Sequence, residues 1–164
     1  TGSCASSIPG GLQSLEDVVV SPDGAHVYVS NRGGDAIEIF QRAADGALTF
    51  STGVSSATIS GPARMAMSAD GESLYVAEFN LDAVSWFDVD PGSGTLTERG
   101  CVQNTGGVSC TATTDGLDNP FDVAISPDGA NVYVAAAQSP SPRNSRTMFC
   151  NTSCGSRGMR PRIR

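Results

Sequence analysis

The sequence predicts an all-β fold: part of a β-propeller, with two complete four-stranded antiparallel blades, half of a third blade and a disordered C-terminal tail. The main observation is a repeat. VVVSPDGAHVYVSN at 18–31 recurs as MAMSADGESLYVAE at 65–78 and as VAISPDGANVYVAA at 123–136. Further short apolar runs follow the first two copies, so a unit of roughly 45 residues holds four strands, which is typical of propeller blades. A β-solenoid usually has shorter coils, and a sandwich would not repeat at this period.

The first copy predicts a hairpin and then two more strands. Its first strand ends at Val20, and the tight turn Ser21-Pro22-Asp23-Gly24 follows. Proline presets φ for the first central residue, aspartate can bond locally, and glycine can adopt the left-handed conformation that closes the hairpin. The second strand, 27–29, is apolar on both faces, as a sheet covered on each side by another sheet requires. Strands at 37–40 and 48–50 complete the blade.

The repeat also sets the expected domain organisation. Residues 1–137 form the propeller segment, with blades at about 17–54, 64–102 and 121–137. Residues 138–164 are rich in Arg, Ser, Gly and Pro and predict an irregular tail. This tail has three possible origins: a basic segment made for a partner, an inserted loop, or out-of-frame or chimeric translation, which we favour.

Propeller rings usually contain four to eight blades. We therefore expect the chain to be a fragment of a longer protein, the alternative being that several copies assemble into a ring. An open stack of two or three blades would expose apolar side chains such as Val27, Val29 and Ile37 or their counterparts, so self-association is expected.

The repeat residues carry a family resemblance. Ser-Pro-Asp-Gly followed by Tyr28-Val29-Ser30-Asn31, with Tyr75-Val76 and Tyr133-Val134 at the equivalent places, resembles the YVTN type of propeller repeat. Within that group, residues 1–137 resemble the lactonase-like seven-bladed propellers, relatives of 6-phosphogluconolactonase and of the muconate-lactonising cyclases. The resemblance is informative about fold rather than function, because such propellers host several unrelated activities.

Candidate ligand-binding residues stand just ahead of the inner strands. Counting back four residues from the serine of each turn gives Asp17, Arg64 and Asp122 at equivalent positions. The inner strands of a propeller line its channel, so these charges would lie at the channel mouth. They could bind a small polar or carboxylate ligand or, with more aspartates from other blades, a cation such as calcium. The alternative, which we favour, is that they cap strand ends in solvent.

The lactonase resemblance implies a further comparison at Arg64. In that family an inner strand is preceded by Gly-Pro-Arg-His, whose basic residues act at the substrate carboxylate and in ring opening. This chain has Gly61-Pro62-Ala63-Arg64, so the arginine stands in approximately the right place and the histidine is absent. His26 lies on the second strand of its repeat and does not replace it. We therefore assign no catalytic residue, although Arg64 could orient a carboxylate.

Composition narrows the class of partner. The 164 residues include 10 basic residues, all arginine, and 17 acidic ones, for a formal net charge of −7. This acidity argues against nucleic acid or an anionic membrane surface as a partner. No apolar segment approaches the length needed to span a bilayer. We expect the partners to be neighbouring propeller blades or further copies of the chain.

The five cysteines fit an exported, oxidising setting: extracellular, periplasmic or at the cell surface. No CxxC or Cys/His cluster is present, so neither a metal site nor a cofactor is expected. Cys101 and Cys110, nine residues apart, are expected to form a disulfide that closes an inter-blade loop. A disulfide at Cys4, which stands at the place equivalent to Cys110, would need a partner cysteine outside the chain.

These observations favour a repeat scaffold or binding module of an exported lactonase-like protein, without a complete active site. The alternative is an enzyme, a lactone hydrolase or a lactonising cyclase, acting at the channel mouth with residues from further blades. Glu78, Asp35 and Asp82 are interpreted as turn and surface residues, and Trp86 and Phe87 as packing between blades.

Overall fold

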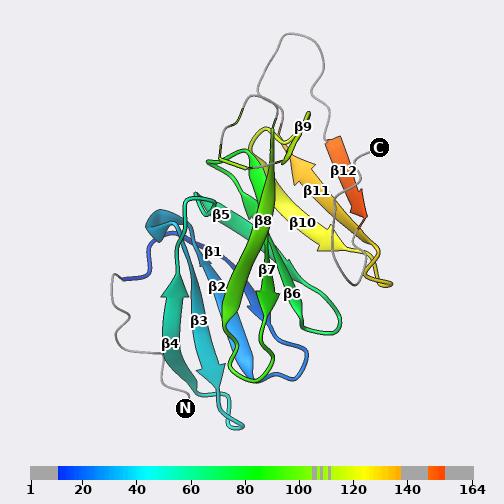
Figure 1. Ribbon diagram of the computed structural model, residues 1–164. Coiled ribbons are helices and arrows are strands. Elements are labelled where there is room, and N and C mark those ends of the chain that lie inside the picture. Colours follow the sequence, from blue (N-terminus) through cyan, green and yellow to red (C-terminus); the bar gives the residue numbers. More distant parts are fainter. Residues whose placement is uncertain (1–10, 105–106, 108, 111, 138–147, 154–164) are drawn as a thin grey trace.

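The described part of the chain forms three sheets of short strands that lie next to one another (Figure 1). The computed structural model describes residues 11–104, 107, 109–110, 112–137 and 148–153. Blade 1 contains β1 (Leu15–Val20), β2 (His26–Asn31), β3 (Ala36–Arg42) and β4 (Leu48–Val54). Blade 2 contains β5 (Pro62–Met67), β6 (Ser73–Glu78), β7 (Ala83–Val89), β8 (Leu96–Asn104) and β9 (Ala112–Thr114). Blade 3 contains β10 (Pro120–Ile125), β11 (Asn131–Ala136) and β12 (Met148–Ser153).

The predicted fold class is confirmed. Strands β1 to β4, and likewise β5 to β8, pair antiparallel in sequence order, which is the meander of a propeller blade. The one helical element in the described ranges is a single 3₁₀ turn, Arg32–Gly34. No helix among the described residues is long and apolar enough to cross a membrane.

Two strands extend this plan beyond the sequence analysis. β9 pairs parallel with the end of β8, with Val102 opposite Ala112. β12 pairs antiparallel with β11, with Val134 opposite Cys150. The sequence analysis expected no strand in this part of the tail because the segment lacks alternation of apolar and polar residues. β11 offers it a free edge, and backbone pairing at an edge depends little on side-chain pattern.

The turn that recurs in each blade has the expected geometry. The Ser21 hydroxyl and the Ala25 amide both donate hydrogen bonds to Asp23 Oδ1, at 2.5 and 3.0 Å, and Gly24 has a left-handed φ of 72°. The same contacts recur at Asp70 and Asp128. The serine hydroxyl in each turn lowers the pKa of the carboxyl group. Each turn thus orders its own hairpin locally.

The hydrophobic core lies between the sheets. One cluster joins Tyr28, Ile37 and Ile39 of blade 1 to residues of blade 2 that include Leu74 and Phe87. A second cluster joins blade 2 to blade 3, and Trp86 packs against it. Trp86 and Phe87 therefore both pack between blades, as predicted, and they face opposite neighbours. Each blade is stabilised mainly through its contacts with the next.

The predicted disulfide is present. Cys101 on β8 is bonded to Cys110, with their Cα atoms 5.3 Å apart. Gln103 organises the same loop, since its side-chain oxygen accepts hydrogen bonds from the Ser109 and Cys110 amides at 3.0 and 3.4 Å. Its side-chain nitrogen donates to the Leu81 carbonyl at 2.8 Å. The loop between blades 2 and 3 is thereby fixed to the body of blade 2.

Replacing both Cys101 and Cys110 with serine is expected to lower the free energy of unfolding by about 2 to 3 kcal/mol, because the bond restricts a short loop in the unfolded chain. Urea unfolding of the double variant, beside the native chain with and without reductant, measures this cost. A double variant as stable as the oxidised native chain would contradict the expectation.

Candidate functional site

One end of the three blades gathers the polar groups of interest. Leu15 pairs with Asn31, Pro62 with Glu78, and Pro120 with Ala136, so the inner strands begin where the second strands end. We call this the inner-strand end. Each inner strand has a shift in register at this place, within 15–17, 62–65 and 120–122. Such bulges redirect side chains and are frequent beside functional sites.

The structure brings two of the three candidate ligand-binding residues together. Arg64 Nη1 lies 3.7 Å from Asp17 Oδ1, and the other oxygen, Oδ2, accepts a hydrogen bond from the Met65 amide at 2.8 Å. The Arg64 side chain is 57% exposed. Asp17 of blade 1 is therefore held against blade 2, while the guanidinium remains open to solvent.

Asp122 makes a different contact. Its Oδ1 accepts a hydrogen bond from the amide of its neighbour Val123 at 3.0 Å, and the residue is exposed. In blade 1 the equivalent carboxylate bonds the next blade instead. Of the three candidates, Asp17 and Arg64 form a local ion pair, and Asp122 lies at the matching place on blade 3 without joining it.

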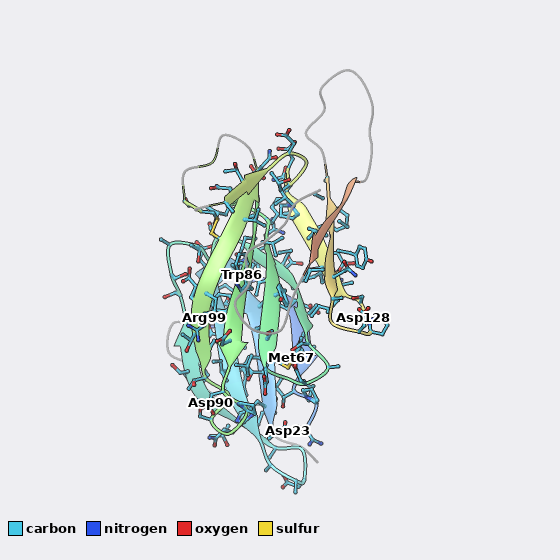
Figure 2. The ribbon with its side chains drawn as sticks, turned by 45° about the vertical axis from the view of Figure 1, so that its right-hand side comes forward. Asp23, Met67, Trp86, Asp90, Arg99 and Asp128 are labelled. Atoms are coloured by element: carbon cyan, nitrogen blue, oxygen red, sulfur yellow. A yellow bond between two sulfur atoms is a disulfide. The ribbon has the colours of Figure 1, made fainter. Side chains whose placement is uncertain are left out.

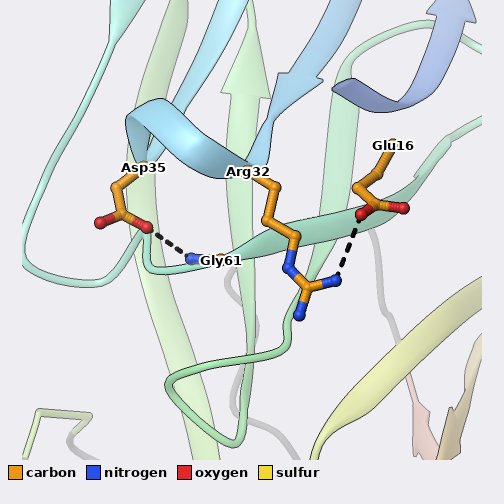
Figure 3. A network of polar contacts seen from close by, with 4 residues as sticks. All are labelled: Glu16, Arg32, Asp35 and Gly61. Atoms are coloured by element: carbon orange, nitrogen blue, oxygen red, sulfur yellow. Dashed lines mark hydrogen bonds and ion pairs between the residues drawn. The ribbon is translucent and has the colours of Figure 1, made fainter. Parts of the chain in front are cut away.

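Two aspartates that the sequence analysis treated as turn residues connect neighbouring blades, and Figure 3 shows the contact of the first, Asp35. Asp35 Oδ1 accepts a hydrogen bond from the Gly61 amide, and Asp82 Oδ1 from the Asn119 amide, each at 2.7 Å. Both aspartates have left-handed backbones, with φ of 47° and 53°. Asp and Asn tolerate this region better than most residues. The same aspartate-to-amide hydrogen bond thus links blade 1 to blade 2 and blade 2 to blade 3.

Arg32 adds a second contact between blades 1 and 2. Its guanidinium binds Glu16 at 3.2 Å (Figure 3), and it also lies over the Phe79 ring, 4.3 Å from the ring centre. A cation placed over an aromatic face is attracted by the ring quadrupole. The exposed ion pair with Glu16 is worth little by itself, so the contact with the Phe79 ring is the part of this arrangement that joins the two blades.

Glu78 is not the surface residue that the sequence analysis expected. It is fully buried between blades 1 and 2. The Ser85 hydroxyl donates to its Oε1 at 2.7 Å, and the Ser60 amide donates to its Oε2 at 2.9 Å. Burial raises its pKa to about 8, and the negative charges of Asp35 and Glu98 act in the same direction.

The repeat contained a signal for Glu78 that single positions did not reveal. Glu78 occupies the place of Asn31 in blade 1, and Ser85 that of Glu38. In blade 1 the pair is reversed: Asn31 Nδ2 donates to Glu38 Oε1 at 2.9 Å, and Asn31 Oδ1 accepts from the Gln13 amide at 3.0 Å. Blades 1 and 2 thus each place one carboxyl group at this level, on one strand or the other, whereas blade 3 has Ala136 at the place of Glu78.

His26 lies at the opposite end of the blade from Arg64. It is buried at the start of β2 and packs against Gly94, where an added Cβ would collide with the His26 ring. Gly94 belongs to the turn that contains Asp90, which Figure 2 shows near the lower end of the molecule, with Asp23. The chain's single histidine is therefore too far from Arg64 to serve as its general base.

In the described ranges, no three His, Cys, Asp or Glu side chains gather closely enough to hold a metal ion. At the inner-strand end the three candidates offer the exposed Arg64 guanidinium, the carboxylates of Asp17 and Asp122 and bulged backbone, with the Arg32–Glu16 ion pair nearby. Such a set can hold a small anionic or hydroxylated molecule by charge-assisted hydrogen bonds.

Four-stranded antiparallel blades that pack face to face, with polar residues at the start of the inner strands, define a β-propeller protein. Its family follows from comparison with known proteins. Residues 5–113 match the family model described as "Lactonase, 7-bladed beta-propeller". The chain belongs to this family.

Solved structures agree with the assignment. A protein of Bacteroides fragilis, described as a candidate 6-phosphogluconolactonase, has 26% sequence identity and a TM-score of 0.68, over 87% of this chain and 35% of that protein. A candidate 6-phosphogluconolactonase from Bacteroides uniformis has 19% identity and a TM-score of 0.72, over 91% and 39%.

The periplasmic gluconolactonase of Pseudomonas aeruginosa has 21% identity and a TM-score of 0.70, over 92% of this chain and 38% of that protein. The chain thus spans between 35% and 39% of the length of these three relatives. No curated protein matches it.

Proposed function

We propose that the chain is a blade scaffold and binding module of an exported lactonase-like propeller, and that Arg64 holds the carboxylate of a small sugar-acid ligand. The observation that carries this proposal is the exposed Arg64 guanidinium, positioned by Asp17 at the start of an inner strand. The ligand class is supported by the gluconolactonase and 6-phosphogluconolactonase names of its structural neighbours.

Export has two supports. The chain contains the Cys101–Cys110 disulfide. Disulfides persist in oxidising compartments and are rare in cytosolic proteins. One structural neighbour is described as periplasmic. Both observations support the proposal that the protein works outside the cytoplasm.

Binding of gluconate tests the role of Arg64. We expect the Arg64→Gln variant to bind gluconate roughly 10- to 100-fold more weakly than the native chain, because a hydrogen bond to a charged group contributes about 1.5 to 3 kcal/mol. Titration followed by NMR or calorimetry measures the affinity. Arg99→Gln is the matched control, since Arg99 is an exposed arginine paired with Asp88 on an outer strand. Equal affinities for all three proteins, or no binding at all, would exclude the proposed site.

Lactone hydrolysis is the second candidate, favoured by membership of the lactonase family. It needs a general base, and the carboxylate that the described residues place beside Arg64, that of Asp17, is already bonded to Arg64 and to the Met65 amide. Consumption of glucono-δ-lactone, followed at constant pH against the spontaneous rate, distinguishes the two functions. A rate above background that the Arg64→Gln change abolishes would show an enzyme, whereas gluconate binding without such a rate supports the binding module.

A further inference from the structure

The backbone that leads into β5 is held by two carboxyl groups from different blades. Asp35 of blade 1 accepts a hydrogen bond from the Gly61 amide at 2.7 Å (Figure 3), and Glu78 of blade 2 accepts one from the Ser60 amide at 2.9 Å. The carbonyls of the same two residues accept hydrogen bonds from the amides of residues 79–80. We call residues 60–61 the lead segment.

The lead segment has little room to change its conformation. Gly61 has a left-handed φ of 63°, and a Cβ there would collide with the Asn80 side chain. β5 begins at the next residue, Pro62, and Arg64 is its third residue. Because the strand follows the lead segment directly, a displacement of this segment moves the backbone that carries Arg64.

Glu78 enters this contact with a proton. It is 0% exposed, and burial raises its pKa to about 8. A backbone amide can only donate, so the proton belongs on Oε1 rather than on the oxygen that faces Ser60. The Ser85 hydroxyl lies 2.7 Å from Oε1, and a hydroxyl can accept as well as donate. Neutral Glu78 thus satisfies both neighbours without placing a charge between the blades.

The charges that act on Glu78 oppose the loss of that proton. Asp35, from the turn before β3, and Glu98, from β8, are both negative and both raise its pKa. Other charged groups on the surrounding elements are engaged elsewhere: Arg32 with Glu16, Arg64 with Asp17, Asp82 with the Asn119 amide, and Asp88 with Arg99. An ionised Glu78 would add a third negative charge. Asp35 is exposed, so repulsion can turn it toward solvent and away from the Gly61 amide.

We propose that Glu78 is a positioning residue for Arg64: its protonated form lets both blades hold the lead segment, and its ionised form releases the contact from blade 1. Ligand binding at Arg64 then weakens as the pH rises, a consequence that rests on the proposed function. The third blade provides a comparison. Ala136 stands there at the place of Glu78, and the Asn119 amide donates to Asp82. The proton-dependent contact therefore belongs to the interface between blades 1 and 2.

Three amide signals in ¹H–¹⁵N NMR spectra test this coupling without any ligand. The Ser60 and Gly61 amides report on the two carboxyl contacts. The Met65 amide, which donates to Asp17, reports on the surroundings of Arg64. We expect all three signals to shift in one step with a midpoint near pH 8, because a single proton controls them.

Variants assign the step to Glu78. Glu78→Gln should lack it, whereas Glu72→Gln, at an exposed position in the β5–β6 turn, should keep it. Asp35→Asn retains an oxygen for the Gly61 amide but removes a negative charge, so it should move the midpoint to lower pH. The Asn119 amide is the internal control and should not follow the step, since it donates to Asp82 in the other interface.

Gluconate binding separates this inference from the proposed function. Between pH 7 and 9 the Arg64 guanidinium and the gluconate carboxylate both stay charged. We expect the native affinity to fall roughly 3- to 10-fold over this range and that of Glu78→Gln to stay constant. An amide step without gluconate binding would support the coupling and exclude the proposed ligand. The inference is wrong if the three amides do not share a step, if Glu78→Gln retains it, or if the two affinities fall in parallel.

Discussion

Replacing Glu78 with glutamine is expected to raise the free energy of unfolding near pH 8 and to leave it almost unchanged near pH 4. Glu78 is buried between two blades and has a pKa of about 8, against an ordinary value of 4.5. One pKa unit corresponds to about 1.4 kcal/mol, so the expected gain near pH 8 is roughly 2 to 4 kcal/mol. This is a large fraction of the stability of a small domain.

The sign follows from proton linkage. Between pH 4.5 and about 8 the folded chain keeps the Glu78 proton, whereas the unfolded chain releases it. The folded state therefore binds more protons, and the free energy of unfolding falls as the pH rises through this window. Glutamine has no proton to lose, so the variant should lack this part of the decline. Its amide can donate to Ser85 and accept from the Ser60 amide, which preserves both contacts.

Urea unfolding at several pH values from 4 to 9 measures the difference between the two proteins. Because all other titrating groups are shared, their effects cancel in that difference. Glu72→Gln, at an exposed position in the β5–β6 turn, is the matched control and should follow the native curve. Parallel curves for the native and Glu78→Gln chains would show that Glu78 does not titrate differently in the folded state.

The second large effect is expected at Tyr28. Its ring is fully buried between blades 1 and 2, and its hydroxyl donates a hydrogen bond to the Gly94 carbonyl at 3.0 Å. Burial also raises its pKa to about 12. Tyr28→Ala should cost about 3 to 5 kcal/mol, in the range seen when a buried aromatic ring is deleted.

Tyr133→Ala is the internal control, since the repeat places the same residue type on the equivalent strand with its ring partly in solvent. At concentrations where the chain is not associated, we expect it to cost less than about 1 kcal/mol. Urea unfolding compares the two variants. Similar costs at both positions would mean that the contact between blades 1 and 2 does not form in solution.

Local chemistry explains why the fold could be read from the sequence. The conformation of the Ser-Pro-Asp-Gly turn is determined locally, because the hydroxyl, carboxylate and glycine that shape it lie within a few residues of one another. The same holds for the apolar strands on either side and for Cys101 and Cys110, whose short separation brings them together. The repeat then multiplies one blade into a stack, and this predicted the all-β propeller class.

The candidate site depended on groups far apart in the chain. Asp17 is bonded by an amide 48 residues away, and Asp35 by one 26 residues away. No local pattern distinguishes such carboxylates from those of solvated turns, so Asp35 and Asp82 were interpreted as surface groups. Asp122 shares its position with Asp17 and yet bonds only its own strand.

By itself, the sequence determined the blade: its turns, its strand order, its two apolar faces and the disulfide. The tertiary structure decided which surfaces of each blade are in contact. It buries Glu78, it bonds Asp35 and Asp82 to the following blade, and it leaves Val18 and Tyr133 exposed. The physical reason is that burial and electrostatics at a blade face belong to the pair of blades. Identical positions in a repeat differ in solvent access according to which neighbour covers them.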